Sequence, residues 1–207
     1  MRSKLILGAL LLTLGVILAS QFFLLGKDTL LKNNQPVEET ETVSVEACWA
    51  NWYPDFESLM GNFNLVVVGN VVESQLDPQD PTFTFHEVFV QEVIKDASNE
   101  VKKGNTVTIW QFGGIWAPNA SAPPVPVEFR DSPLMKEGET SLLFLNHRDD
   151  GMYAGVSPQT RFIVQNGMVY WLGAVYEHRN IAISKNLQIE GEGLNEIISL
   201  LQQLPET

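Results

Sequence analysis

Residues 65–73 read LVVVGNVVE, an apolar and mostly β-branched run that a single glycine interrupts. Valine side chains are stiff and pack well on a pleated surface, so the run predicts a buried β-strand. Gly69 lies in the middle of this strand, and a glycine there is typical of a bulge or a sharp bend. The stretch therefore predicts a strand that curls round a barrel.

The runs that follow have period two, with aromatic and β-branched side chains alternating with polar ones. Residues 82–94 predict the longest strand, with a shift of phase near Val88. Residues 106–112 predict another strand, which the glycine pair 113–114 ends. Residues 115–133 contain five prolines, and this density predicts a long irregular loop rather than a strand.

The C-terminal half of the chain continues the β pattern and ends in a helix. Asn166-Gly167 separates two alternating runs, and this dipeptide favours a type I′ hairpin because both central residues need positive φ. Residues 194–204 place apolar side chains on one flank and predict an amphipathic helix, while residues 55–60 predict a short one. Further strands are expected over residues 141–146, 152–156, 160–165 and 168–171.

Three motifs carry a resemblance to a known family. They are VGNVV at residues 68–72, VIKD at 93–96 and KEGETSLLFL at 136–145. In this order they resemble exported barrel domains of the inhibitor-of-metalloproteinase and netrin-module type, which are oligonucleotide-binding-fold (OB-fold) barrels. The likeness covers residues 55–170. It implies a mainly β fold, an OB-like barrel of five to seven strands with a short N-terminal helix and a C-terminal helix.

The activity of those inhibitors is not implied. They chelate the zinc of their target through an N-terminal cysteine that is held in disulfides, whereas Cys48 lies inside the chain and is its only cysteine. A single cysteine also excludes an intramolecular disulfide and any Cys-rich zinc or redox framework. Because one barrel fold hosts many functions, the resemblance bears on architecture alone.

Residues 1–26 form an apolar segment that predicts one transmembrane helix before the barrel. Residues 5–25 carry no charge and would form a helix about 31 Å long, close to the thickness of a bilayer core. A cleaved signal peptide is the alternative, but a cut that leaves Leu18 at position −3 lacks the small residue required there. Arg2 and Lys4 supply positive charge at the cytoplasmic end. The sequence predicts a single-pass membrane protein with its C-terminal domain outside the cytoplasm, or a secreted domain after cleavage.

Residues 27–47 are polar and acidic without an apolar period, so they predict a flexible tether. Residues 48–207 then form one extracytoplasmic β-barrel domain, long enough to bury a core. The whole chain holds 13 Lys and Arg against 25 Asp and Glu, a formal net charge of −12. Because nucleic-acid binding needs a basic face, this balance predicts no nucleic-acid partner.

Catalytic and metal-binding patterns are sparse. The HExxH, GxSxG, GxGxxG and P-loop strings are absent, and no cofactor or metal is expected. His86 precedes Glu87 in a predicted strand, so the two side chains point to opposite faces and do not chelate one metal together. Near His147, Asp149 and Asp150 offer oxygen ligands for Ca²⁺, but they lack the spacing of a calcium hand. A solvated turn is the favoured interpretation.

Three functions stay open. The leading hypothesis is a non-catalytic binding module that recognises an envelope protein or peptide through the proline-rich loop, although the loop can also simply cover an open barrel end. The second is an envelope hydrolase that uses His147 or His178 with neighbouring carboxylates. The third is a structural or assembly subunit in which the anchor and residues 194–204 contact a membrane partner. The candidate binding residues of the leading hypothesis are Phe112, Ile115, Trp116 and Phe129.

Overall fold

The computed structural model describes residues 42–117, 119, 121–176 and 183–205. The predicted anchor over residues 1–26, most of the predicted tether and His178 lie outside the described residues. In the part of the chain that is described, no helix is long and apolar enough to cross a membrane.

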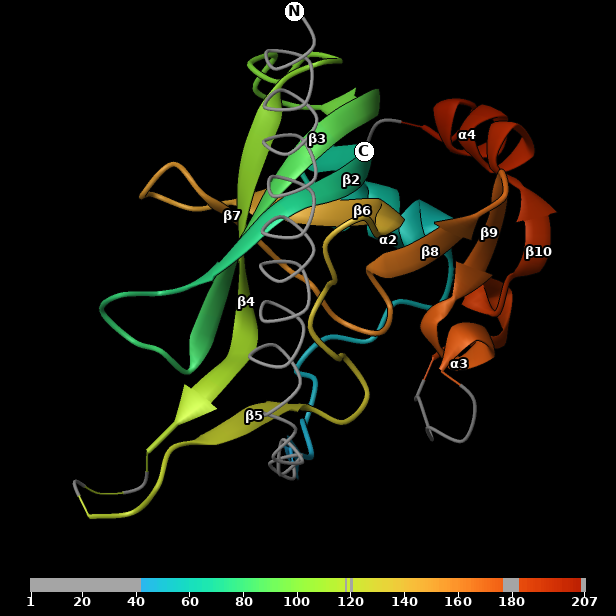
Figure 1. Cartoon of the computed structure of the whole chain (residues 1–207). Coiled ribbons are helices and arrows are strands. Elements are labelled where there is room, and N and C mark those ends of the chain that lie inside the picture. The colour runs from blue at the N-terminus through green and yellow to red at the C-terminus, as the bar shows by residue number, and fades with distance from the viewer. Residues whose placement is uncertain (1–41, 118, 120, 177–182, 206–207) are drawn as a thin grey trace, which may run out of the picture. The chain divides into compact units, whose positions relative to one another are not determined.

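The centre of the fold is a closed five-stranded β-barrel (Figure 1). Its strands are β2 (Leu65–Leu76), β3 (Phe83–Asp96), β4 (Thr106–Trp116), β6 (Thr140–His147) and β7 (Tyr153–Ala154). β2 pairs antiparallel with β3 and β6, and β3 pairs antiparallel with β4. The short β7 closes the circle, because it pairs parallel with β4 and antiparallel with β6. This pairing is compatible with an OB-like barrel and confirms the predicted mainly β fold class.

Strand β2 is buried on both faces over its first half and β6 over most of its length, which explains why these stretches are apolar almost without interruption. In β2, Val67 points into the barrel while its neighbour Val66 points outward into a second core. In β6, Leu143 points inward and Leu142 points outward in the same way. Adjacent residues of a strand face opposite sides of the sheet, so these two strands form a wall that the two cores share.

A second layer covers the outer face of this wall (Figure 1). The elements of the layer are α2 (Phe56–Asn62), β8 (Arg161–Gln165), β9 (Met168–Trp171), α3 (Leu172–Val175), the 3₁₀ helix η1 (Lys185–Leu187), β10 (Glu190–Gly193) and α4 (Leu194–Gln202). The strands continue the sheet from β6 in the order β8, β9, β10. α4 turns Ile197 and Leu201 into the outer core and leaves Leu200 exposed. The predicted helices near both ends of the domain are confirmed, and the buried flank of α4 packs within its own domain.

Two local predictions are also confirmed. Asn166 and Gly167 connect β8 and β9 with φ angles of 53° and 76°, the positive values that a type I′ turn needs. Gly69 lies at a break in the β2–β3 register, and a Cβ atom there would collide with the Cγ1 atom of Val88. The glycine therefore allows the bulge by which β2 bends round the barrel.

The phase shift predicted near Val88 lies a few residues later in β3: the register with β2 shifts between Val90 and Glu92, and the next side chain that packs on the inner core is Val93. The buried side chains alternate without a break through Thr84, His86, Val88 and Val90. The two polar side chains are tolerated inside because they have partners: the Thr84 hydroxyl donates to the Gly113 carbonyl at 2.6 Å, and His86 pairs with a serine hydroxyl. The aromatic side chains of the same run, which suggested the shift, instead face the outside of the barrel.

The predictions that the glycine pair 113–114 ends a strand and that residues 115–133 form an irregular loop are wrong. β4 continues to Trp116 and pairs antiparallel with β5 (Val125–Phe129). β5 contains a single proline, Pro126, so the other prolines of the segment do not interrupt its ladder. We call the paired residues 113–116 and 125–129 the arm, which extends from the barrel at the lower left of Figure 1.

The glycine pair shapes the arm instead of ending it. Gly113 has a φ of 133°, which residues with a side chain rarely adopt. A Cβ atom at Gly114 would collide with the Pro81 carbonyl, which accepts a hydrogen bond from the Ile115 amide at 2.7 Å. The arm therefore runs close beside the loop between β2 and β3. On its other edge, β5 pairs parallel with β1 (Val43–Val45), which lies at the end of the segment predicted as a tether.

Candidate functional site

The four predicted binding residues lie in the arm or directly next to it, at the base where it joins the barrel. They do not form one cluster. Phe112 and Phe129 lie at the base and stack with their ring centroids 4.3 Å apart. Trp116 lies at the far end of β4 with 44% of its surface exposed. Ile115 is half-buried and points to the other face of the strand. The structure thus brings Phe112 together with Phe129 and places Trp116 apart from them.

Leu76 places a second exposed apolar side chain on the face of β4 that Trp116 shares. A Cβ atom at Gly114 would lie 3.0 Å from the Cδ2 atom of Leu76, so Leu76 lies on the face of β4 to which position 114 points. Trp116 points to the same face, because side chains alternate along a strand. Leu76 is 44% exposed as well. No local pattern marks Leu76 as part of a site, because it reaches the arm from a different strand.

A cleft of about 340 Å³ opens at the base of the arm. We call residues 49–53 the strap; all of them except Trp52 line the cleft, together with residues 110–112 of β4 and residues between the end of β6 and the start of β8. The aromatic lining residues are Trp49, Tyr53, Phe63, Trp110, Phe112 and Phe129. The amide and hydroxyl lining residues are Asn51, Gln111, Asn146, Ser157 and Thr160. Among the described residues, no charged side chain lines this cleft.

The strap is fixed in place by hydrogen bonds to residues distant in sequence. The Trp49 indole N–H donates to the Asp131 carboxylate at 2.6 Å. The buried Gln159 side chain accepts from the Tyr53 amide at 2.9 Å and donates to the Asn51 carbonyl at 3.3 Å. The two ends of one amide group therefore hold the strap, and the cleft wall is formed before any ligand binds.

Aromatic packing continues from the cleft over the outer face of β3 and β4. The rings of Phe83 and Trp110 are nearly parallel with their centroids 3.8 Å apart. The Arg148 guanidinium lies 4.3 Å from the centroid of the Trp110 ring, a cation–π contact. Arg148 also donates to both carboxylate oxygens of Asp150, and these hydrogen bonds lower the pKa of the Asp150 carboxyl. At this turn, Asp150 therefore pairs with an arginine.

The structure offers no metal cluster or catalytic histidine pair in its described ranges. His86 is fully buried in the barrel, with Nδ1 2.8 Å from the Ser74 hydroxyl. Burial, followed by the positive charge of Arg161, lowers the pKa of His86 to about 4. His147 is exposed at the end of β6 and packs edge-on against the β7 tyrosine. Neither of these two histidines hydrogen-bonds to a carboxylate, and His178 lies outside the described residues.

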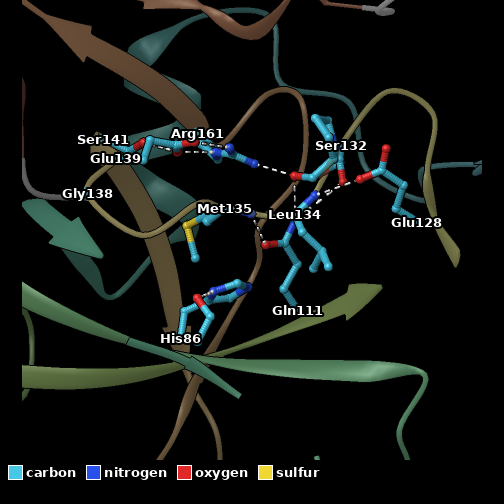
Figure 2. A network of polar contacts seen from close by, with 12 residues as sticks. His86, Gln111, Glu128, Ser132, Leu134, Met135, Gly138, Glu139, Ser141 and Arg161 are labelled. Carbon is cyan, nitrogen blue, oxygen red and sulfur yellow. Dashed lines mark hydrogen bonds and ion pairs between the residues drawn. The ribbon is translucent and has the colours of Figure 1, made fainter. Parts of the chain in front are cut away.

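A buried polar network fixes the segment between β5 and β6 against the barrel (Figure 2). Arg161 is fully buried and donates to both carboxylate oxygens of Glu139, at 3.0 and 2.8 Å. It also donates to the Pro133 carbonyl at 2.5 Å. Gln111 donates to the same carbonyl at 3.1 Å and accepts from the Met135 amide at 3.2 Å. Because these buried groups satisfy one another, we interpret the network as structural.

The described fold defines a β-barrel protein with an outer layer, a projecting arm and an uncharged aromatic cleft. No protein-family model matches the sequence, and no curated protein is similar to it. The barrel agrees with the OB-like part of the predicted resemblance. The narrower likeness to metalloproteinase inhibitors and netrin modules has no support from these comparisons.

Proposed function

We propose that the protein is a non-catalytic binding module held at the outer face of a membrane, and that its arm recognises a partner protein or peptide. The observation that carries this proposal is the pair of exposed apolar side chains, Trp116 and Leu76, on one face of the arm. Tryptophan dominates many protein interfaces, because one side chain removes a large apolar area from water. Exposed apolar side chains that share one face favour a contact surface over a solvated one.

The pairing of the arm supports the same proposal. β5 is hydrogen-bonded to β1 on one edge and to β4 on the other, and β4 is bonded through Ile115 to the Pro81 carbonyl. A surface that is already ordered loses less conformational entropy when it binds. The arm is therefore better suited to recognition than a flexible loop of the same composition.

The membrane location rests on residues 1–26, whose apolar sequence favours a single-pass anchor over a cleaved signal peptide. The net charge of −12 favours a partner other than nucleic acid. A hydrolase that uses His147 has less support, because the exposed imidazole packs on an aromatic ring and has no carboxylate partner among the described residues.

The test is a crosslinking pull-down of the intact, membrane-bound protein, comparing wild type with Trp116→Ala. We expect the variant to capture its partner at least about tenfold less well, because it loses the largest apolar contact of the arm. Trp52→Ala is the matched control, since Trp52 is 54% exposed and lies in the strap rather than the arm. Both variants should unfold in urea within about 0.5 kcal/mol of wild type, because exposed side chains contribute little to stability.

A second variant guards against an indirect effect of the tryptophan. Leu76→Asp places a charge on the face of β4 that Trp116 shares, without removing the indole, and it should weaken capture of the same partner. Equal capture by wild type, Trp116→Ala and Leu76→Asp would show that the arm is not the recognition surface. The next candidate contact surfaces would then be the predicted anchor and Leu200, the exposed apolar residue of α4.

A further inference from the structure

We propose that the cleft at the base of the arm is a second binding site, and that its ligand is a neutral saccharide. The site differs from the arm surface, because the lining of the cleft includes neither Trp116 nor Leu76. The proposal therefore stands or fails independently of partner recognition by the arm.

The charge of the lining carries the first step. The chain has a formal net charge of −12, yet no charged side chain lines the cleft within the described residues. An anionic ligand group that leaves water needs a positive charge or a set of charge-assisted hydrogen bonds. The lining offers no positive charge, and the negative charge of the whole chain disfavours anions further. A cation would need the face of an aromatic ring, and the Arg148 guanidinium already lies over the Trp110 ring of this cleft. The ligand class that we propose is therefore uncharged.

The chemistry of the lining carries the second step. Aromatic rings have an electron-rich face, and a pyranose ring presents a face of weakly positive C–H groups that packs on such rings. The hydroxyl groups of a sugar both donate and accept hydrogen bonds, as amide and phenol side chains do. Three side-chain groups of the lining make no hydrogen bond to another protein group within the described structure. They are the side-chain amide of Asn51, the side-chain amino group of Asn146 and the hydroxyl of Tyr53. These groups are therefore free to bind sugar hydroxyls.

The rigidity of the walls carries the third step. The buried Gln159 holds the strap at two points, and Asp131 holds Trp49. On the opposite wall, Gly155 has a φ of 120°, and a Cβ atom there would lie 3.1 Å from the Phe63 ring. Glycine thus lets this loop pack close to the Phe63 ring. The volume of about 340 Å³ lies at the small end of ligand-binding clefts and suits a short saccharide.

An extended peptide fits the cleft less well. Peptides that add to a sheet need an unpaired strand edge, but both edges of β5 are occupied, by β4 and by β1. The backbone of the strap is also engaged, because Gln159 holds the Asn51 carbonyl and the Tyr53 amide. These two features favour recognition through side chains, which suits a saccharide. A proline-rich peptide, which docks on aromatic grooves without sheet pairing, is the competing class that the test includes.

The experiment uses the full chain in a sugar-free detergent, because residues 1–26 are apolar and sugar-based detergents would compete. Chitotriose and maltotriose are the neutral probes, trigalacturonate is the anionic probe, and a proline-rich decapeptide is the peptide probe. Binding is followed by calorimetric titration with each probe up to about 10 mM, which detects millimolar dissociation constants. We expect at least one neutral trisaccharide to bind and trigalacturonate not to bind.

Two variants locate the binding. Ala50→Trp fills the cleft from an exposed position and removes no hydrogen bond of a side chain, so we expect it to raise the Kd of the bound trisaccharide at least about tenfold. Trp52→Ala is the control, because Trp52 lies in the strap but outside the cleft lining, and its Kd should match wild type. The proposal is overturned if neither neutral trisaccharide binds, if Ala50→Trp binds as tightly as wild type, or if the decapeptide binds in preference.

Discussion

The inward face of β3 carries a titratable side chain in a place where a charge is unfavourable. His86 is fully buried, and its Nε2 atom has no hydrogen-bond partner among the described residues. Arg161 already contributes a positive charge to this interior, and Glu139 is its ion-pair partner. A second positive charge on His86 would lack such a partner, so the neutral imidazole is the form that the folded barrel stabilises.

This burial makes stability depend on pH. Between the ordinary pKa of 6.5 and the folded-state pKa of about 4, the unfolded chain holds a proton on His86 that the folded chain does not. We therefore expect acidification through this window to lower the free energy of unfolding, by up to about 3 kcal/mol for this one group. Below the folded-state pKa, this group causes no further loss. Urea unfolding of wild type and His86→Gln at several pH values measures the effect.

The difference in stability between wild type and His86→Gln should shrink as the pH falls, because glutamine does not titrate. His147→Gln is the matched control, because it makes the same exchange at an exposed histidine outside the barrel. If wild type and His86→Gln lose stability in parallel, the proton uptake lies elsewhere in the chain.

At the scale of elements, the arm depends on a close approach between two backbones. The Cβ atom of Gly114→Ala would meet the Pro81 carbonyl, which the Ile115 amide holds in place. The carbonyl cannot yield without losing that hydrogen bond. We expect Gly114→Ala to lower the free energy of unfolding by about 1 to 3 kcal/mol, measured by urea denaturation.

Leu76 offers the control for this prediction, because its side chain is the other neighbour of the added methyl group. Leu76→Ala removes that neighbour and leaves the carbonyl in place. The double variant Gly114→Ala, Leu76→Ala should therefore stay destabilised relative to Leu76→Ala alone. Full recovery in the double variant would mean that the clash involves the flexible side chain and not the backbone.

Elements with a local signature were predictable from the sequence, and the arm was not. The valine run at residues 65–73, the Asn166-Gly167 turn and the two helices follow from residue type and spacing. The signature of β5 is weaker, because Pro126 interrupts the alternating run VPVEF, and its pairing with β4 and β1 joins segments that the pattern does not bring together. β10 is similar: its sequence, EGEG, carries no apolar pattern, and it is a strand because it pairs with β9.

The residues of the candidate sites were also predictable only in part from the sequence. Phe112 and Phe129 are predictable as large aromatic side chains near a proline-rich segment, and both line the cleft. The strap and Gln159 are not predictable, because more than a hundred residues separate Gln159 from the backbone groups that it binds. Hydrophobic periodicity also does not identify Arg161 as a buried residue, because it is a charged side chain at the first position of a strand in which apolar residues follow. Contacts between distant segments are what the sequence pattern leaves undetermined.

At the scale of the whole molecule, the shared wall of β2 and β6 couples the barrel to the outer layer. Leu201 of α4 is fully buried in the outer core. We expect Leu201→Ala to lower the free energy of unfolding by about 2 to 5 kcal/mol. Because the wall serves both cores, the barrel should unfold together with the outer layer. The measurement is urea unfolding followed by circular dichroism and by amide hydrogen exchange in β3 and β4.

Leu200→Ala is the matched control for this prediction. Leu200 precedes Leu201 directly but is 47% exposed, so its truncation should change stability by less than about 0.5 kcal/mol. If Leu201→Ala releases the outer layer while exchange in β3 and β4 stays as slow as in wild type, the two layers are independent folding units.

The closure of the barrel rests on its shortest strand. β7 has two residues and meets β4 through a single residue pair, Ile109 opposite Tyr153, whereas β2 and β3 share a long ladder. Thermal opening of the barrel should therefore begin between β4 and β7, while the other strand pairs stay formed. Trp110 and Ala154 flank this seam, and both line the cleft. A ligand bound in the cleft would contact both β4 and β7 across this seam. Its binding should therefore slow the opening of the whole barrel.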